Sequence, residues 1–121
     1  MARVFGLAFV ALQVRDLESS ARFYEERLGL GRAPQVSPDA VVFATGTVPF
    51  AVHGPLVDLD AVAQLGWGVV ALWMGCDDAQ ALYESLKEAN VLMAQEPFDG
   101  PFGRTFAFPD PDGYTVTVHD A

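Results

Sequence analysis

The stretch VALQVRDLESSARFYEERL (residues 10–28) has the same layout as VALWMGCDDAQALYESLKEA (residues 70–89). Each begins with Val-Ala-Leu. An aspartate follows, and after it come tyrosine and leucine residues at helical spacing. Each half later contains a short segment that ends in Val-His, FAVHG at 50–54 and TVTVHD at 115–120. The shared order of these pieces predicts two similar half-chains of about sixty residues.

Each half has the pattern of a βαβββ module. Residues 9–14 alternate between the two faces of a predicted strand. Asp16 or Ser19 is a candidate cap for the helix that follows, and Asp77 or Asp78 has this position in the second half. The expected strands are 9–14, 31–36, 40–45 and 48–53 in the first half, and 69–74, 91–94, 104–108 and 114–119 in the second. Residues within 55–66 are expected to form a short helical turn.

The composition fits one compact domain and excludes several partners. The chain has 121 residues, and 51% of them are apolar. With 7 basic and 16 acidic residues, its net charge of −9 disfavours nucleic acid, whose phosphates would be repelled. The single cysteine, Cys76, allows no internal disulfide and fits a reducing cytoplasm. The two longest apolar runs have about ten residues, too few to span a membrane.

The two half-chains carry a resemblance to a known family. VALQVRDLESSARFYEERLGL at the start and GRTFAFPDPDGYTVTV at residues 103–118 resemble the opening and closing signatures of the vicinal oxygen chelate superfamily. This superfamily holds glyoxalase, bleomycin-resistance proteins and extradiol dioxygenases. The resemblance implies an α+β fold, with two tandem βαβββ modules that form half-open sheets around a central cavity. We expect a single domain over 1–121, with modules at 4–54 and 67–120 and a linker at 55–66.

The residues at the family's metal positions do not suit a metal. Metal-dependent relatives place four ligands on equivalent strands, and the resemblance puts these positions at Phe9, near 69–71, at Ala51 and at Thr117. None of them carries the histidine, carboxylate or thiolate that such sites need. We therefore expect no metal and no cofactor. The Asp-Pro-Asp-Gly sequence at 110–113 is interpreted as a tight turn, because each of its residues favours one.

A ligand surface is expected instead. Strand alternation places Phe9 and Gln13 on the face that the resemblance turns toward the cavity, and Trp73 at the position equivalent to Gln13. Aromatic rings suit flat or cationic organic compounds. The loop 95–106 is a candidate flap, and its Arg104 either holds an anionic group or balances nearby aspartates. The predicted ligand-binding residues are Phe9, Gln13, His53, Trp67, Trp73, Phe102, Arg104, Thr117 and His119.

Two functions follow as hypotheses. The first is a metal-free protein of the bleomycin-resistance type, which binds a small aromatic or cationic compound such as an antibiotic and thereby sequesters it. The alternative is a glyoxalase-like lyase or isomerase, or a dioxygenase, with metal ligands at shifted positions such as His53 and His119. The sequence favours binding over catalysis without settling whether the chain is an enzyme. The resemblance implies a homodimer.

Overall fold

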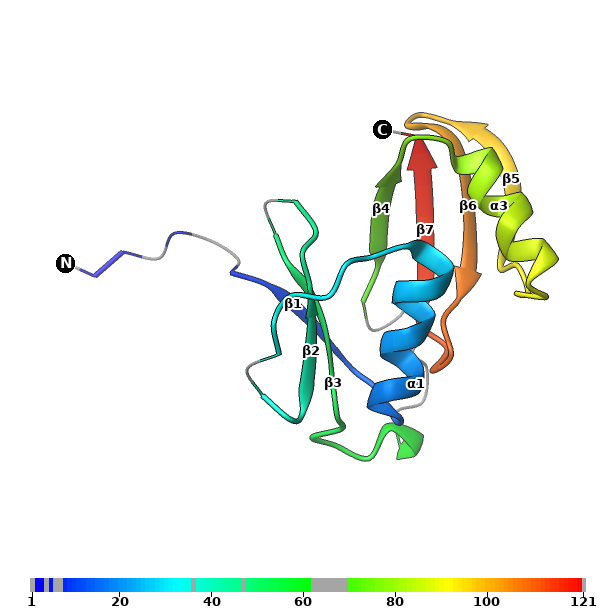
Figure 1. Cartoon of the computed structure of the whole chain (residues 1–121). Helices are drawn as coiled ribbons and strands as arrows, with labels where there is room; N and C mark the ends of the chain where they lie inside the picture. Colours follow the sequence, from blue (N-terminus) through cyan, green and yellow to red (C-terminus); the bar gives the residue numbers. More distant parts are fainter. Residues whose placement is uncertain are drawn as a thin grey trace. The chain divides into compact units, whose positions relative to one another are not determined.

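The computed structural model describes residues 2–3, 5, 8–35, 37–46, 48–61 and 70–120. The chain forms two compact units, Met1–Leu59 and Asp60–Ala121. Each unit contains one open mixed sheet with a helix against it (Figure 1). This arrangement confirms the α+β fold class.

The first unit carries a three-stranded sheet. Its elements are β1 (Val10–Gln13), α1 (Leu17–Arg22), the π-helical turn η1 (Phe23–Arg27), β2 (Ala40–Phe43) and β3 (Phe50–His53). The strand order is β1-β3-β2, with β1 parallel and β2 antiparallel to β3.

Aromatic rings form the core of the first unit. Tyr24 on η1 lies with its ring centroid 4.9 Å from that of Phe50 and 6.2 Å from that of Phe43. All three side chains are buried, and α1 packs against β2 and β3. Alternation along β3 therefore assigns Phe50 and Val52 to the helix side of the sheet, and Ala51 and His53 to the opposite side.

The second unit carries a four-stranded sheet. Its elements are β4 (Leu72–Cys76), α3 (Ala79–Glu88), β5 (Gln95–Gly100), β6 (Gly103–Pro109) and β7 (Thr115–Asp120). The strand order is β4-β7-β6-β5, and only the β4–β7 pair is parallel. Figure 1 shows α3 lying along this sheet, where it contacts β6 and β7.

A short 3-10 helix, η2 (Leu59–Ala61), lies at the boundary between the units. It occupies part of the stretch for which the sequence predicts a helical turn. The rest of that stretch, from residue 62, lies outside the described residues, as does Trp67.

Aspartates start both main helices. The Asp16 Oδ1 atom accepts a hydrogen bond from the Ser19 amide, and the Asp78 Oδ1 atom accepts one from the Ala81 amide, each at 3.0 Å. These bonds satisfy amides that a helix leaves unpaired in its first turn. They select Asp16 over Ser19 and Asp78 over Asp77 as the N-caps. The two caps are 62 residues apart, because 78 − 16 = 62.

The strand register shows that the sequence-based alignment of the two half-chains is displaced by two residues. His53 pairs with Gln13, and His119 pairs with Gly75, so the two histidines are equivalent and Gln13 corresponds to Gly75. The Val-Ala-Leu residues, offset by 60, are therefore not at equivalent positions in the two sheets. The prediction that Trp73 matches Gln13 is wrong, since Trp73 corresponds to Ala11.

Two predicted strands and the predicted loop also differ. The predicted strand 31–36 is reduced to one bridge between Arg32 and Phe43, with Val36 outside the described residues. The strand predicted at 91–94 begins at Gln95 instead. The predicted loop 95–106 is a β5–β6 hairpin, in which Pro101 and Phe102 form the turn. Its Pro97 is tolerated because β5 is an edge strand with an irregular register there.

The Asp-Pro-Asp-Gly sequence is a turn, as predicted. Asp110 is buried, and its Oδ1 atom accepts hydrogen bonds from the amides of Asp112 and Tyr114, each at 2.9 Å. Gly113 has a φ of 99°, which favours glycine. This carboxylate therefore organises the turn between β6 and β7.

Candidate functional site

The sheet of the second unit has two different faces. The Asp120 Oδ1 atom accepts a hydrogen bond from the Ala79 amide at the start of α3, so Asp120 lies on the helix side. Alternation along β7 then places Thr117 and His119 on the opposite side, which we call the open face. Trp73 pairs with Thr117 and shares this face.

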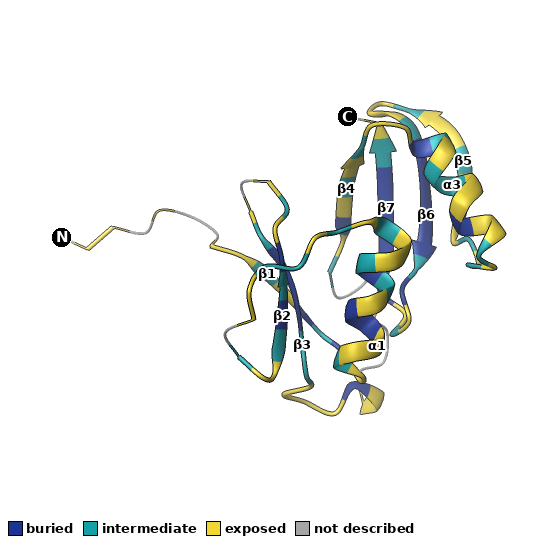
Figure 2. Ribbon diagram, viewed as in Figure 1, coloured by how far each residue is buried: buried dark blue, intermediate teal, exposed yellow. Residues whose placement is uncertain are grey.

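Three aromatic side chains meet on the open face. The ring centroid of Trp73 lies 5.9 Å from that of Phe102 and 6.3 Å from that of His119, and the Phe102 and His119 centroids are 5.4 Å apart. Trp73 is 54% exposed and Phe102 is 59% exposed. We call these three residues the aromatic cluster. Figure 2 shows the contrast between the exposed edge strand β4 and the largely buried strand β7 beside it.

The backbone fixes the tautomer of His119. Its Nδ1 atom lies 2.8 Å from the carbonyl oxygen of Asp120. Because a carbonyl oxygen only accepts hydrogen bonds, Nδ1 must carry the proton. In a neutral ring Nε2 is then an acceptor. His53 repeats this arrangement in the first unit, with Nδ1 2.6 Å from the Gly54 carbonyl oxygen.

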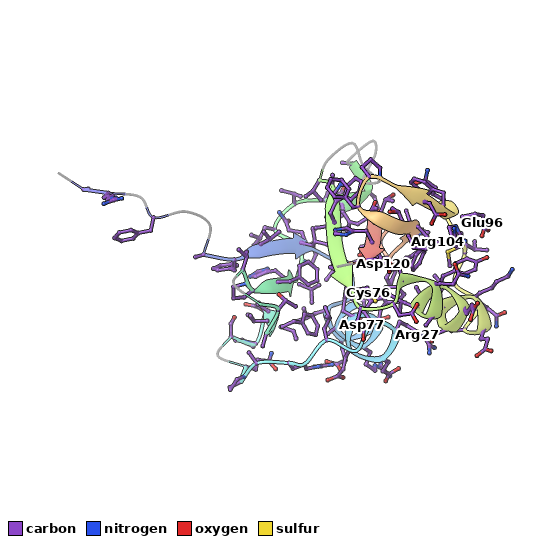
Figure 3. The ribbon with its side chains drawn as sticks, turned by 90° about the horizontal axis from the view of Figure 1, so that it is seen from above. Arg27, Cys76, Asp77, Glu96, Arg104 and Asp120 are labelled. Carbon is purple, nitrogen blue, oxygen red and sulfur yellow. The ribbon has the colours of Figure 1, made fainter. Side chains whose placement is uncertain are left out.

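Two other predicted site residues of the second unit lie apart from the cluster's exposed surface. Thr117 shares the open face but is buried. Arg104 lies on the helix side, where its Nε atom donates to the Gln80 side chain at 2.9 Å and its Nη1 atom pairs with Asp99 at 3.3 Å. Figure 3 shows Arg104 beside α3. This geometry matches the alternative that Arg104 balances a nearby aspartate.

The predicted site residues of the first unit form no comparable cluster among the described residues. Phe9 is 58% exposed. The Oε1 atom of Gln13 accepts hydrogen bonds from the amides of Leu56 and Val57, at 2.8 and 3.2 Å, and so fastens the segment that follows β3. The sequence carries no signal for this contact, because the partners are 43 and 44 residues apart.

Acidic residues gather where β4 leads into α3, but their oxygens already have structural roles (Figure 3). Asp78 caps α3, and Asp120 accepts from the Ala79 and Arg104 amides. Burial, together with the charges of Asp77 and Asp120, raises the pKa of the neighbouring Cys76 thiol, although a backbone hydrogen bond at Asp78 opposes this. A raised pKa disfavours the thiolate that a nucleophile requires.

No group of three or more His, Cys, Asp or Glu side chains in the described ranges is arranged to hold a metal ion. The family's ligand positions at Phe9, Ala51 and Thr117 offer two apolar side chains and one buried hydroxyl. The donor set therefore does not fit the family metal. Of the helices that the structure describes, none combines the length and hydropathy that crossing a bilayer requires.

Comparisons with known proteins agree with this fold. The sequence model of the Glyoxalase/Bleomycin resistance protein/Dioxygenase superfamily matches residues 6–118. A crystal structure of a protein of unknown function from Agrobacterium tumefaciens str. C58 is similar with a TM-score of 0.78 and 25% identity, over 99% of this chain and 97% of that chain. No curated protein matches the sequence.

Two further solved structures share the fold at lower identity. TnmS3, an antibiotic binding protein from Streptomyces sp. CB03234, has a TM-score of 0.73 and 23% identity, over 99% of this chain and 98% of that chain. Lactoylglutathione lyase from Agrobacterium tumefaciens has a TM-score of 0.72 and 18% identity, over 99% and 96%. The same fold thus occurs in a binding protein and in an enzyme.

Proposed function

Since this chain belongs to the Glyoxalase/Bleomycin resistance protein/Dioxygenase superfamily, we propose that it is a metal-free small-molecule-binding protein. Its ligand is an aromatic or cationic organic compound, and binding sequesters a toxic compound such as an antibiotic. The observation that carries this proposal is the aromatic cluster of Trp73, Phe102 and His119.

The cluster has the properties of a stacking surface. Its rings come from β4, the β5–β6 turn and β7, so three separate backbone segments hold them in place. Aromatic pairs contribute roughly 0.5–1.5 kcal/mol beyond the area that they bury. The exposed faces of Trp73 and Phe102 leave this contribution open to a flat ligand. The net charge of −9 supports a cationic ligand, which the negative ring faces also attract.

The likeness to TnmS3 supports the same proposal, since TnmS3 is an antibiotic binding protein with this fold. The likeness to lactoylglutathione lyase keeps catalysis as the alternative, with metal ligands at shifted positions. We place this alternative second because His53 and His119 supply two donors, and a bound metal usually takes at least three protein ligands. The donor positions of the family are filled by other side chains in this sequence.

We make two further proposals, one on the oligomeric state and one on the cellular location. We propose a homodimer, which is supported by β1 and β4, because each is the edge strand of its own sheet and an edge strand offers unpaired backbone groups. We also propose a cytoplasmic location, which the single cysteine, free in the structure, supports.

Calorimetric titration with a panel of flat aromatic compounds, charged and neutral, tests the binding proposal. Trp73→Ala and Phe102→Ala each remove one ring of the cluster, so we expect each to weaken binding of the best compound about tenfold. Leu92→Ala is the control, because Leu92 is an exposed apolar side chain outside the predicted site, and we expect its affinity to stay unchanged.

Two outcomes would count against the proposal. Equal affinity in the wild type and in both cluster variants would place the ligand elsewhere. Elemental analysis that finds one tightly held metal per chain, with binding lost on its removal, would contradict the metal-free part. His53→Ala and His119→Ala would then identify the ligands.

A further inference from the structure

His119 brings a hydrogen-bond acceptor to the aromatic cluster. The Nδ1–H group of His119 is committed to the Asp120 carbonyl oxygen at 2.8 Å. In the neutral imidazole, the Nε2 atom then has a lone pair and no proton. Within the described part of the chain, Nε2 has no hydrogen-bond partner.

The imidazole that carries this acceptor lies beside the other two rings. Its centroid is 5.4 Å from that of Phe102 and 6.3 Å from that of Trp73, and Nε2 is the ring nitrogen that is not bonded to Cγ. A ligand that stacks on all three rings would contact Nε2 and remove it from water. Burying an acceptor without a partner costs about 1–3 kcal/mol, so a ligand that supplies a donor is favoured over one that does not.

We infer that the ligand of this site carries an N–H or O–H donor on, or next to, its aromatic ring, and that His119 selects it through Nε2. The chemical class is a phenol, a ring N–H compound or an aromatic amine. This inference rests on the proposed binding function and adds a specificity-determining residue to it. His53, with the same tautomer, does not take this role, because its unit has Ala11 at the position of Trp73.

Indole and benzofuran provide a direct test. The two molecules share one flat frame, but indole has an N–H donor where benzofuran has an oxygen. We expect wild-type protein to bind indole about fivefold more tightly than benzofuran, as one neutral hydrogen bond predicts. NMR titration gives both dissociation constants, because it remains accurate for weak ligands.

His119→Phe is the decisive variant. It keeps a ring beside Trp73 and Phe102 but removes the acceptor, so indole and benzofuran should then bind equally. Leu92→Ala, at an exposed side chain outside the predicted site, is the control, and it should retain the wild-type preference. Long-range ¹H–¹⁵N correlation spectra of the free protein provide an independent readout, since they should show Nδ1 protonated and Nε2 unprotonated in His119.

The outcomes separate this inference from the proposed function. Equal binding of the two probes by the wild type, a preference that survives His119→Phe, or an Nε2-protonated neutral ring would overturn the inference while leaving the aromatic cluster as a binding surface. Failure of both probes to bind, or binding that Trp73→Ala does not weaken, would count against the proposed function and the inference together.

Discussion

The two units are built alike but use their open faces differently. In both units a capping aspartate starts the helix, a parallel edge strand precedes it, and the central strand carries a histidine whose Nδ1 bonds to the next carbonyl oxygen. In the second unit, Trp73 stands where the first unit has Ala11. In the first unit, Gln13 stands where the second has Gly75, and its side chain fastens Leu56 and Val57.

Equivalent strand positions in the two units thus serve different purposes on the same type of fold. An amide side chain on the edge strand organises the chain that follows, whereas a large ring two pairing positions away offers surface to a ligand. The helix-side cores show no such division, since each contains one stacked and one edge-to-face pair of aromatic rings. We therefore predict that the two cores contribute equally to stability, whereas the two open faces differ in ligand binding.

Substitutions in the two cores are expected to have the largest effect on stability. Phe43 in the first unit and Phe106 in the second are both fully buried and both contact two further rings. We expect Phe43→Ala and Phe106→Ala each to lower the free energy of unfolding by about 3–5 kcal/mol, because each leaves a cavity. Urea unfolding measures this loss. The control Leu92→Ala, at a side chain that is 79% exposed, should change stability by less than about 0.5 kcal/mol.

A large loss of unfolding free energy in only one of the two Phe variants would contradict the predicted equality of the two cores. It would mean that one unit forms the stable part of the fold while the other is held weakly. Equal losses would sharpen the comparison, because they would confine the difference between the units to their open faces.

Substitution of Gln13 is expected to have an intermediate effect on stability. Gln13→Ala removes the acceptor for two backbone amides, so we expect a loss of about 1 kcal/mol in the free energy of unfolding. Amide hydrogen exchange at Leu56 and Val57 should accelerate, while exchange in β7 stays unchanged. Affinity for an aromatic ligand should also be unchanged, and a clear loss of affinity would show that Gln13 belongs to the ligand site after all.

The smallest effect concerns Cys76, whose equivalent in the first unit is the buried Val14. Because burial raises the pKa of the Cys76 thiol, alkylation by iodoacetamide near pH 8 should be several-fold slower in the folded protein than in urea. Asp77→Asn should speed the reaction slightly, since Asp77 also raises this pKa. A folded-state rate equal to that in urea would contradict the raised pKa.

The same shift has a consequence for stability. The folded state keeps the thiol proton to higher pH than the unfolded chain does. Stability from this group is thus fully present below the unfolded pKa of about 8.5, and it is lost as the pH rises through the folded pKa. Cys76→Val should remove that part of the alkaline decline, which pH-dependent urea unfolding would detect.

Local sequence was enough for the parts of the fold that depend on neighbouring residues. The caps at Asp16 and Asp78 were among the predicted alternatives, because a cap needs only the few residues after it. The turn at 110–113 was predicted for the same reason. Alternation along one strand also accounts for the burial of Phe50.

The sequence by itself determined the helix starts and the turn, since each rests on residues within about one helical turn of one another. The repeat and the α+β class followed from the order of such local patterns along the chain. Only the tertiary structure decided the two-residue register, the hairpin in place of the predicted loop, and the partners of Gln13 and Arg104. It also brought Phe102 from a turn to His119 and Trp73. The physical reason is that strand pairing joins backbone groups far apart in the chain, and a shift of register leaves the local pattern almost unchanged.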